Sequence, residues 1–360
     1  MKLNSVSKLL LNFKNYFLKK KVLFSGNIQD SLPEILKTKN SGIHIQKYNF
    51  LKYIKNITKK KIFINFLMKK KIIKNYNTII YFFSKNKKES YFQLKNIISI
   101  VKKETSIFLV GENKSGINSF IKFFKKEILF KKLSYGKKCV IYLTILKNNV
   151  SFNLKNFYKI HYWKKIPIKF LPGVFGYKKI DKGSKLLVST FYSKLISNKK
   201  ILDMGSGSGF LSIVILKLNE NNKITLSDSC LKSIKCCKEN FKLNKLKGVF
   251  KKSDLYSNIY KKFNLIISNP PVHDNLKKSF SFLTKFIYKS IFYLKKNGEL
   301  RLVINKSFSY SKNIRNIFKK FNILKENKNF IVYQIFIKNL KEIFLNKIYP
   351  KRDSNPQSYK

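Results

Sequence analysis

The feature that most constrains the fold is a glycine-rich turn between an apolar strand and an apolar helix. Lys200–Met204 reads as a buried strand, residues 205–209 read Gly-Ser-Gly-Ser-Gly, and Phe210–Leu218 continues as a helix. In this context the glycines let the backbone pass close to a ligand, and the helix N-terminus offers N–H donors to it. The pattern therefore predicts an α/β sheet with a ligand at the carboxyl ends of its strands.

Two acidic residues extend this predicted site. Asp228 ends the apolar strand 224–228, at a distance from the glycines that favours an acceptor for ribose hydroxyls. Asp254 follows a third short strand, 248–250, and offers an acceptor for an adenine amino group. The turn lacks the lysine of triphosphate-binding loops and the glycine spacing of dinucleotide enzymes. A nucleoside with a small charged tail is the ligand that fits.

A second motif lies further along, where the apolar run 265–268 stops at Asn269 and is followed by Pro270 and Pro271. An Asn oxygen in a rigid frame can accept a hydrogen bond from a planar nitrogen, which makes a site for chemistry on an amino group. Asn-Pro is also an ordinary turn initiator. The position downstream of the glycine turn favours the chemical interpretation. For His273, which has no evident partner, we expect structural hydrogen bonding rather than a role as general base.

The length of 360 residues suits two domains. Apolar runs at 22–26, 78–83 and 107–110 alternate with helical segments, which predicts a parallel sheet with crossovers in the first half. Both halves share the order strand, polar turn, helix, strand and Asn-Lys-Ser turn. We interpret this as a duplication whose first copy lost the glycine turn and the Asn-Pro-Pro. Trp163, near the expected boundary at 150–168, is predicted to be a packing residue.

The composition is strongly basic, with 77 Lys and Arg against 17 Asp and Glu and a formal net charge of +60. A polyanionic partner such as nucleic acid explains this excess. Compositional bias is the alternative, because Lys, Asn, Ile and Phe are abundant throughout. The four cysteines and three histidines show no metal-ligand spacing. With no apolar run of membrane-spanning length and no signal-peptide pattern, we expect a cytoplasmic protein with reduced thiols, no metal and no membrane association.

The glycine turn, Asp228 and Asn-Pro-Pro together look like the S-adenosylmethionine (AdoMet)-dependent methyltransferases that modify planar amino nitrogens. More specifically, Leu-Pro-Gly-Val-Phe at 171–175, the segment 181–187 and the segment 269–274 resemble the bacterial ribosomal RNA small subunit methyltransferase C family. The likeness extends into the first half at 23–30, 92–94 and 110–116.

The resemblance implies a fold of two tandem Rossmann-like methyltransferase domains. Residues 1–160 would form a degenerate domain for RNA binding or support, residues 161–340 the catalytic domain, and residues 341–360 a basic, disordered tail. It implies AdoMet as cofactor, and methylation of the N2 amino group of one guanine in 16S rRNA. The implied partner is 16S rRNA or the small ribosomal subunit, and we expect a monomer.

The resemblance also implies roles for single residues. Asn269 and Pro270 would be catalytic, through the Asn oxygen and the Pro carbonyl that accept the two amine hydrogens, and Pro271, Val272 and His273 would contact the substrate. The implied cofactor-binding residues are Phe175, Ser184, Asp203, Gly205, Gly207, Gly209, Asp228 and Asp254. Val272 stands where the family has an aromatic residue that stacks on the base. Two alternatives stay open: an amino methyltransferase acting on adenine N6 or a protein glutamine amide, and a noncatalytic RNA-binding or assembly protein.

Overall fold

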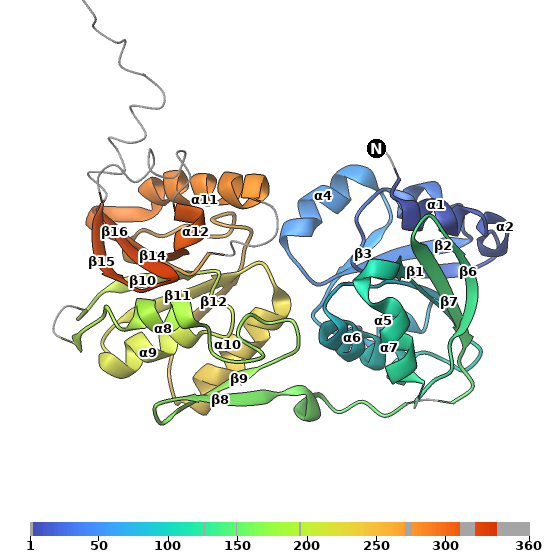
Figure 1. The fold of residues 1–360 in the computed structure, drawn as a ribbon, viewed down its shortest axis with the longest axis horizontal. Coiled ribbons are helices and arrows are strands. Elements are labelled where there is room, and N and C mark those ends of the chain that lie inside the picture. Colours follow the sequence, from blue (N-terminus) through green and yellow to red (C-terminus); the bar gives the residue numbers. More distant parts are fainter. Residues whose placement is uncertain are drawn as a thin grey trace, which may run out of the picture. The chain divides into compact units, whose positions relative to one another are not determined.

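The computed structural model describes residues 3–336 except 126, 149, 194–195, 271–275 and 310–320. The predicted C-terminal tail therefore lies outside the described residues. The chain divides into two compact units. The first comprises Met1–Lys159, Leu171–Val174 and Cys230–Lys232, and the second comprises Ile160–Phe170, Phe175–Ser229 and Ser233–Lys360. Each unit contains one seven-stranded sheet with helices packed on both faces (Figure 1).

The first sheet has the strand order β3-β2-β1-β4-β5-β7-β6. Its strands are β1 (Lys21–Gly26), β2 (Asn40–Ile45), β3 (Lys61–Ile64), β4 (Thr78–Phe82), β5 (Ser106–Glu112), β6 (Lys131–Gly136) and β7 (Cys139–Ile145). The first five pair in parallel, as predicted, but β7 pairs antiparallel with β5 and β6. The expectation of a purely parallel sheet is wrong at this edge. Lys137 and Lys138, both with positive φ, connect β6 to β7, and so short a turn can join only antiparallel strands.

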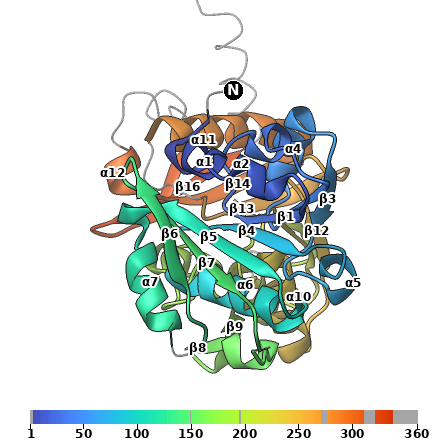
Figure 2. The same ribbon diagram turned by 90° about the vertical axis from the view of Figure 1, so that its right-hand side faces the viewer.

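Two sets of helices cover the faces of this sheet (Figures 1 and 2). One face carries α1 (Ser5–Leu11), α2 (Lys14–Phe17), α3 (Leu32–Ile35) and α4 (Asn49–Ile57), and the other carries α5 (Lys70–Ile73), α6 (Lys87–Ile100) and α7 (Ile117–Phe124). Short 3-10 turns lie at Asn113–Ser115 and Leu154–Phe157. Side chains alternate across a strand, so Val22 and Phe24 of β1 face the first set and Leu23 faces the second.

The second sheet repeats the same order as β12-β11-β10-β13-β14-β16-β15. Its strands are β10 (Lys200–Met204), β11 (Lys223–Asp228), β12 (Val249–Lys252), β13 (Phe263–Ser268), β14 (Leu294–Asn305), β15 (Asn322–Glu326) and β16 (Phe330–Phe336). Here too the last two strands are antiparallel. The matching orders confirm two tandem domains of one topology. In each sheet the order reverses at the first strand, β1 or β10, and ligands of open α/β sheets bind at such a reversal.

The remaining helices are α8 (Lys182–Val188), α9 (Phe210–Leu218), α10 (Leu231–Leu243), α11 (Leu276–Ser290) and α12 (Lys306–Ser309), with a 3-10 turn at Ile291–Tyr293. All belong to the second unit except the first two residues of α10, which cluster with the first. A separate hairpin of β8 (Lys159–Trp163) and β9 (Ile166–Phe170) precedes them. Trp163 of the hairpin packs edge-on against Phe210, the first residue of α9, with ring centroids 5.8 Å apart. This contact agrees with the packing role predicted for the tryptophan.

Candidate active site

The glycine turn after β10 leaves open space beside its backbone. Gly205, Gly207 and Gly209 all have positive φ, at 72°, 56° and 81°. A Cβ added at Gly205 or Gly207 would meet no atom within 4 Å, whereas one at Gly209 would lie 3.2 Å from a methyl carbon of Leu226. The first two glycines therefore border free space, and the third allows α9 to pack closely on β11.

Hydrogen bonds hold this turn in one conformation. The backbone N–H of Gly205 donates to the carbonyl of Ser227 at 2.8 Å, and that of Gly209 donates to the carbonyl of Ser206 at 2.7 Å. The N–H of Gly207 donates to Asp228 Oδ2 at 2.9 Å. The carboxylate predicted to bind ribose thus lies against the glycine turn, at the end of the neighbouring strand.

A cavity opens at this edge of the second sheet. Thirteen residues line it, namely Phe170, Phe175, Gly176, Ile180, Asp181, Ser184, Gly205, Ser206, Gly207, Ser208, Phe210, Leu211 and Asn269. The structure therefore brings together three segments that are far apart in the sequence: the entry to α8, the glycine turn and the end of β13. Phe175, with 48% of its surface exposed, lies among the lining residues.

Asn269 follows β13 directly and is half-buried, and the next residue, Pro270, is buried. The Asn269 side-chain nitrogen Nδ2 donates to Asp181 Oδ2 and to Ser184 Oγ, both at 2.8 Å. Ser268, the last residue of β13, donates from Oγ to the backbone carbonyl of Met204 at 2.8 Å. The end of β13 is thereby tied to the end of β10, immediately before the glycine turn.

Asp203 is fully buried within β10. Its Oδ2 accepts a 2.6 Å hydrogen bond from Ser212 Oγ of α9, and its Oδ1 has no hydrogen-bond partner among the described residues. Burial raises the pKa of this carboxyl group to about 7, and the nearby charge of Asp228 adds to the increase, while the bond from Ser212 opposes it. Asp203 does not line the cavity, so its predicted role in binding the cofactor stays a prediction.

Other predicted site residues lie outside the described cavity or outside the described residues. Asp254 is exposed after β12, and its backbone N–H donates to Ser257 Oγ; its role toward adenine stays a prediction. Pro271, Val272 and His273 belong to the segment that the structure does not describe.

Sequence reasoning did not find Asn240 of α10, which is fully buried and supports the glycine turn. Its Nδ2 donates to the carbonyl of Ser208 and to that of Lys169 in β9, both at 2.8 Å, and its Oδ1 accepts from the Lys169 N–H at 2.7 Å. Asn is so frequent in this chain that no local signal distinguishes this residue. Its position on the buried face of α10 is the only cue.

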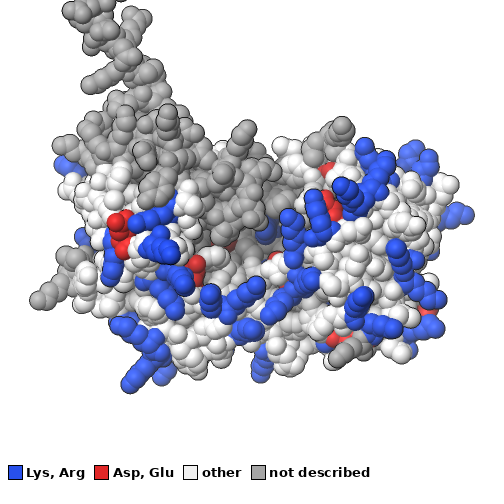
Figure 3. Space-filling model, in the orientation of Figure 1, with Lys and Arg blue, Asp and Glu red and all other residues white. Residues whose placement is uncertain are grey.

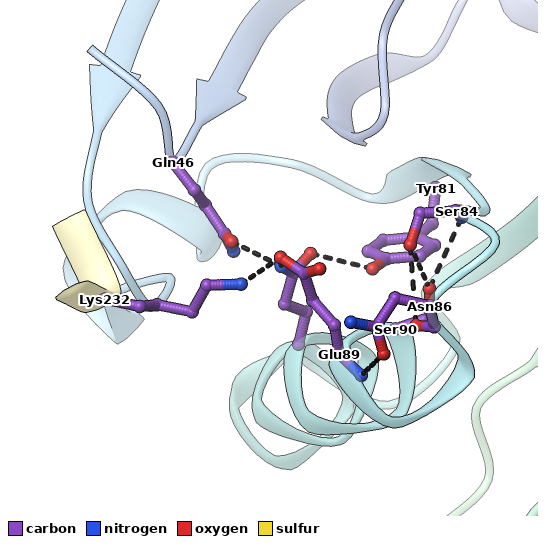
Figure 4. A network of polar contacts seen from close by, with 8 residues as sticks. Gln46, Tyr81, Ser84, Asn86, Glu89, Ser90 and Lys232 are labelled. Atoms are coloured by element: carbon purple, nitrogen blue, oxygen red, sulfur yellow. Dashed lines mark hydrogen bonds and ion pairs between the residues drawn. The ribbon is translucent and has the colours of Figure 1, made fainter. Parts of the chain in front are cut away.

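A polar network lies at the corresponding edge of the first sheet (Figure 4). Tyr81 donates to Gln93 Oε1 at 2.8 Å, and Gln93 Nε2 donates to Gln46 Oε1 and to Glu89 Oε1. Lys232, which clusters with the first unit, forms an ion pair with Glu89. These side chains satisfy one another around a cavity of about 90 Å³. The first unit therefore offers a ligand few groups that are not already engaged.

The described residues show no sign of a membrane span or a metal site. None of the described helices is long and apolar enough to cross a bilayer. The same residues contain no group of three or more His, Cys, Asp or Glu side chains placed to hold a metal ion.

Comparison with known proteins gives matches over almost the whole chain. The family described as "Methyltransferase small domain N-terminal" matches residues 7–161, and "Methyltransferase small domain" matches residues 165–334. Ribosomal RNA small subunit methyltransferase C of Buchnera aphidicola subsp. Schizaphis graminum is 44% identical over 92% of this chain and 98% of its own length. The protein of that name from Buchnera aphidicola subsp. Acyrthosiphon pisum is 41% identical over 94% of this chain and 100% of its own length.

A solved structure shows the same fold. The 16S rRNA N2 G1207 methyltransferase of T. Thermophilus, in complex with AdoMet and guanosine, matches with a TM-score of 0.74 over 92% of both chains, at 17% sequence identity. Because the match covers 92% of this chain, it extends over both seven-stranded sheets described above. On the identity and coverage of its relatives, the chain belongs to the ribosomal RNA small subunit methyltransferase C family.

Proposed function

We propose that this chain transfers a methyl group from AdoMet to the exocyclic N2 amino group of a guanine in 16S rRNA of the small ribosomal subunit. The observation that carries the proposal is the cavity shared by the glycine turn and Asn269. A cofactor cradle and an acceptor for a planar amine lie side by side there. The names of the relatives give small-subunit ribosomal RNA as their substrate, and the structural neighbour is in complex with AdoMet and guanosine.

The residues present fit the cofactor. The open space beside Gly205 and Gly207 admits a ligand against the backbone, and a side chain at either glycine would occupy that space. Asp228, at the end of the adjacent strand, is our candidate for the ribose hydroxyls. When bound, AdoMet supplies a methyl group activated by its sulfonium. Phe175, Gly209, Ser184, Asp203 and Asp254 remain further proposals for this site.

Asn269 and Pro270 are proposed to hold the amine. An aromatic exocyclic amine is a weak nucleophile because its lone pair is delocalised into the ring. If Asn269 Oδ1 and the Pro270 carbonyl accept its two hydrogens, the nitrogen is held with its lone pair directed out of the ring plane. The residues then act by orientation, which can contribute several orders of magnitude in rate. No acid or base is needed for the first step.

The charge of the chain supports an RNA partner. Figure 3 shows Lys and Arg side chains spread over the visible surface of each unit with few acidic residues among them, in line with the formal charge of +60. Such a surface binds phosphates through counterion release. The target guanine must leave its stack to reach the cavity. We propose that residues 1–160 support RNA binding and that residues 161–340 carry the reaction, with the chain acting as a cytoplasmic monomer.

The test is methylation of small subunits and free 16S rRNA from cells that lack the protein, followed by mapping of N2-methylguanine. We expect incorporation at one guanine with the wild type, and a loss of about 100-fold or more with Asn269→Ala. Ser189→Ala is the matched control, because its hydroxyl lies at the other end of α8 and bonds only the Leu186 carbonyl in the described structure. Label found in protein, or in adenine, would replace the guanine assignment. Undiminished product from Asn269→Ala would remove the catalytic role.

A further inference from the structure

We propose that Asp181 and Ser184 are positioning residues that determine which end of the Asn269 amide faces the methyl-accepting amine. The inference rests on the proposed function, because it takes Asn269 as the acceptor for that amine. It assigns to these two side chains a task distinct from holding the cofactor.

The hydrogen bonds of Asn269 are the first line of argument. Within the described part of the chain they all use Nδ2, which donates one hydrogen to Asp181 Oδ2 and the other to Ser184 Oγ, each at 2.8 Å. An amide nitrogen has two hydrogens, so both are engaged. Oδ1 is left for a ligand in the cavity that Asn269, Asp181 and Ser184 line together.

The two ends of an amide are alike in size, so only hydrogen bonding selects the orientation. The reversed amide would place Oδ1 against the Asp181 carboxylate, where two acceptors oppose each other. It would also present N–H groups to an amine that is itself a donor. A fixed orientation therefore decides whether the site accepts the amine or repels it.

Both acceptors are held by the start of α8. Asp181 is the N-cap of this helix, and the same Oδ2 that binds Asn269 also accepts the Ser184 backbone N–H at 2.8 Å. Ser184 is buried, with 8% of its surface exposed. The cap thus fixes the carboxylate, and the carboxylate and the hydroxyl together fix the amide. Such support of a reacting group by rigid neighbours is typical of precise sites.

The charge of Asp181 adds a second effect. A carboxylate that accepts from one end of an amide increases the acceptor strength of the other end, because linked hydrogen bonds polarise one another. The amine nitrogen becomes positive as it forms its fourth bond. A polarised Oδ1 stabilises that charge better than it stabilises the neutral amine, which is the condition for a faster reaction.

The first experiment compares Ser184→Ala and Asp181→Ser with the control Ser189→Ala. The serine hydroxyl can still cap α8 but is shorter than the carboxylate. We expect kcat to fall about 3- to 10-fold in Ser184→Ala and about 10- to 100-fold in Asp181→Ser, as for loss of a neutral and a charged hydrogen bond. Because Ser184 is also a candidate for the cofactor, kcat is measured at saturating AdoMet. The AdoMet affinity of Asp181→Ser, measured by calorimetry, should stay within about threefold, and Ser189→Ala should match the wild type.

The second experiment measures the pH profile of the activity. This profile would not change if the role of Asp181 were merely structural. Asn269→Asp places a carboxyl group against Asp181, so only its protonated form can donate to Asp181 while accepting the amine. Its activity should rise as the pH falls. Adding Asp181→Asn restores a donor opposite the new carboxylate, so the double variant should recover activity at neutral pH and lose the acid-favoured slope.

The outcomes separate this inference from the proposed function. If the wild type methylates guanine N2 and Asn269→Ala is inactive, but Ser184→Ala and Asp181→Ser keep the wild-type kcat, the positioning role is wrong and the function stands. The positioning role is also wrong if adding Asp181→Asn does not shift the pH profile of the activity of Asn269→Asp. This test holds even if Asp181→Ser fails to fold. If the wild type forms no N2-methylguanine, the proposed function itself fails.

Discussion

The two sheets have the same strand order but carry different residues at the carboxyl ends of their strands. Equivalent positions are polar in the second sheet and apolar in the first. The register of the parallel strands shows which residues of the two units are equivalent. In the first unit Val22 pairs with Thr78 and Lys21 with Asn40. In the second unit Ile201 pairs with Leu265 and Lys200 with Lys223 in the same way. Counting along each strand matches Asp203 with Phe24, Asp228 with Ile45, and Asn269 with Phe82. The three first-unit residues are 0%, 4% and 4% exposed. Where the second unit places polar site residues, the first places core.

The glycines after the first strands differ in the same way. Gly26 and Gly205 both have positive φ. A Cβ at Gly26 would lie 2.3 Å from the Phe82 carbonyl oxygen, whereas one at Gly205 would meet nothing within 4 Å. Gly26 permits close packing of β1 on β4 and also lines the cavity of the first unit, whereas the free space of the second unit begins directly at the backbone of Gly205. The difference teaches that strand order alone does not make a site. Whether a sheet edge forms a site depends on the side chains at the ends of three strands and on the space beside the turn after the first strand.

The largest expected effect comes from moving a site residue into the first unit. Phe24→Asp removes a fully buried ring and buries a carboxyl group among apolar residues. We expect a loss of about 5 kcal/mol or more in the free energy of unfolding, measured by urea denaturation. Phe123→Asp is the control, because Phe123 is 61% exposed, and should change stability by less than about 0.5 kcal/mol. A loss below about 1 kcal/mol in Phe24→Asp would show that this edge tolerates site residues.

The next effect concerns pH. Asp203 ionises near its ordinary pKa in the unfolded chain but at about 7 when folded. Its contribution to stability is therefore full below about pH 4 and is lost as the pH rises through about 7. From about pH 5 to about pH 8 the wild type should lose about 2–3 kcal/mol more than Asp203→Asn, in urea denaturation without cofactor. Parallel pH dependence in both proteins would contradict the raised pKa.

His44 of the first unit should affect the pH dependence of stability in the opposite direction to Asp203. It is buried between Ser25 Oγ and the Asn65 carbonyl, each 2.9 Å from a ring nitrogen. Burial lowers its pKa from 6.5 to about 4, against the bond to Asn65, which raises it. Its contribution is therefore present above about pH 6.5 and lost as the pH falls through about 4. His44→Gln should reduce acid sensitivity while leaving the alkaline side unchanged.

A smaller effect is expected when the second unit receives a first-unit residue. Asp228→Ile removes the proposed ribose acceptor and the partner of the Gly207 N–H. AdoMet affinity in calorimetry should fall about 10- to 100-fold, as for loss of a hydrogen bond to a charged group. Glu220→Ala, which removes an exposed charge paired with Lys217, should leave the affinity unchanged. Unaltered binding in Asp228→Ile would mean that the cofactor lies elsewhere, including the first unit.

The second unit was more predictable from sequence than the first for a physical reason. Its glycine turn and the apolar helix at Phe210–Leu218 are local patterns, and the structure has them at the predicted places. In the first unit, β2 and β3 were not predicted, because Asn40–Ile45 and Lys61–Ile64 are short and bordered by lysines. The sequence also does not predict the antiparallel edges, since the pairing direction depends on short turns, two lysines in the first unit and Asn-Lys-Asn at 327–329 in the second.

The site was predictable as a set of strand ends but not as a set of contacts. Spacing brought Gly205, Asp228 and Asn269 to one edge, because parallel strands end on the same side of a sheet. It could not show that the Asn269 amide bonds Asp181, or that Asn240 supports the glycine turn. Those contacts depend on how helices α8 and α10 pack, and tertiary packing leaves no periodic signal in the sequence.

The smallest effect is expected from the polar network of the first unit. Gln93→Leu removes the side chain that links Tyr81, Gln46 and Glu89, so buried polar groups lose partners at a cost of about 1–2 kcal/mol in unfolding free energy. Because the groups of this network bond one another and none of them lines the cavity of the second unit, methyl transfer and AdoMet affinity should stay at wild-type values. Ser119→Ala, an exposed hydroxyl of the same unit, is the stability control. A second equivalent of AdoMet bound by Gln93→Leu would contradict this expectation, because it would mean that the network closes a second cofactor site in the first unit.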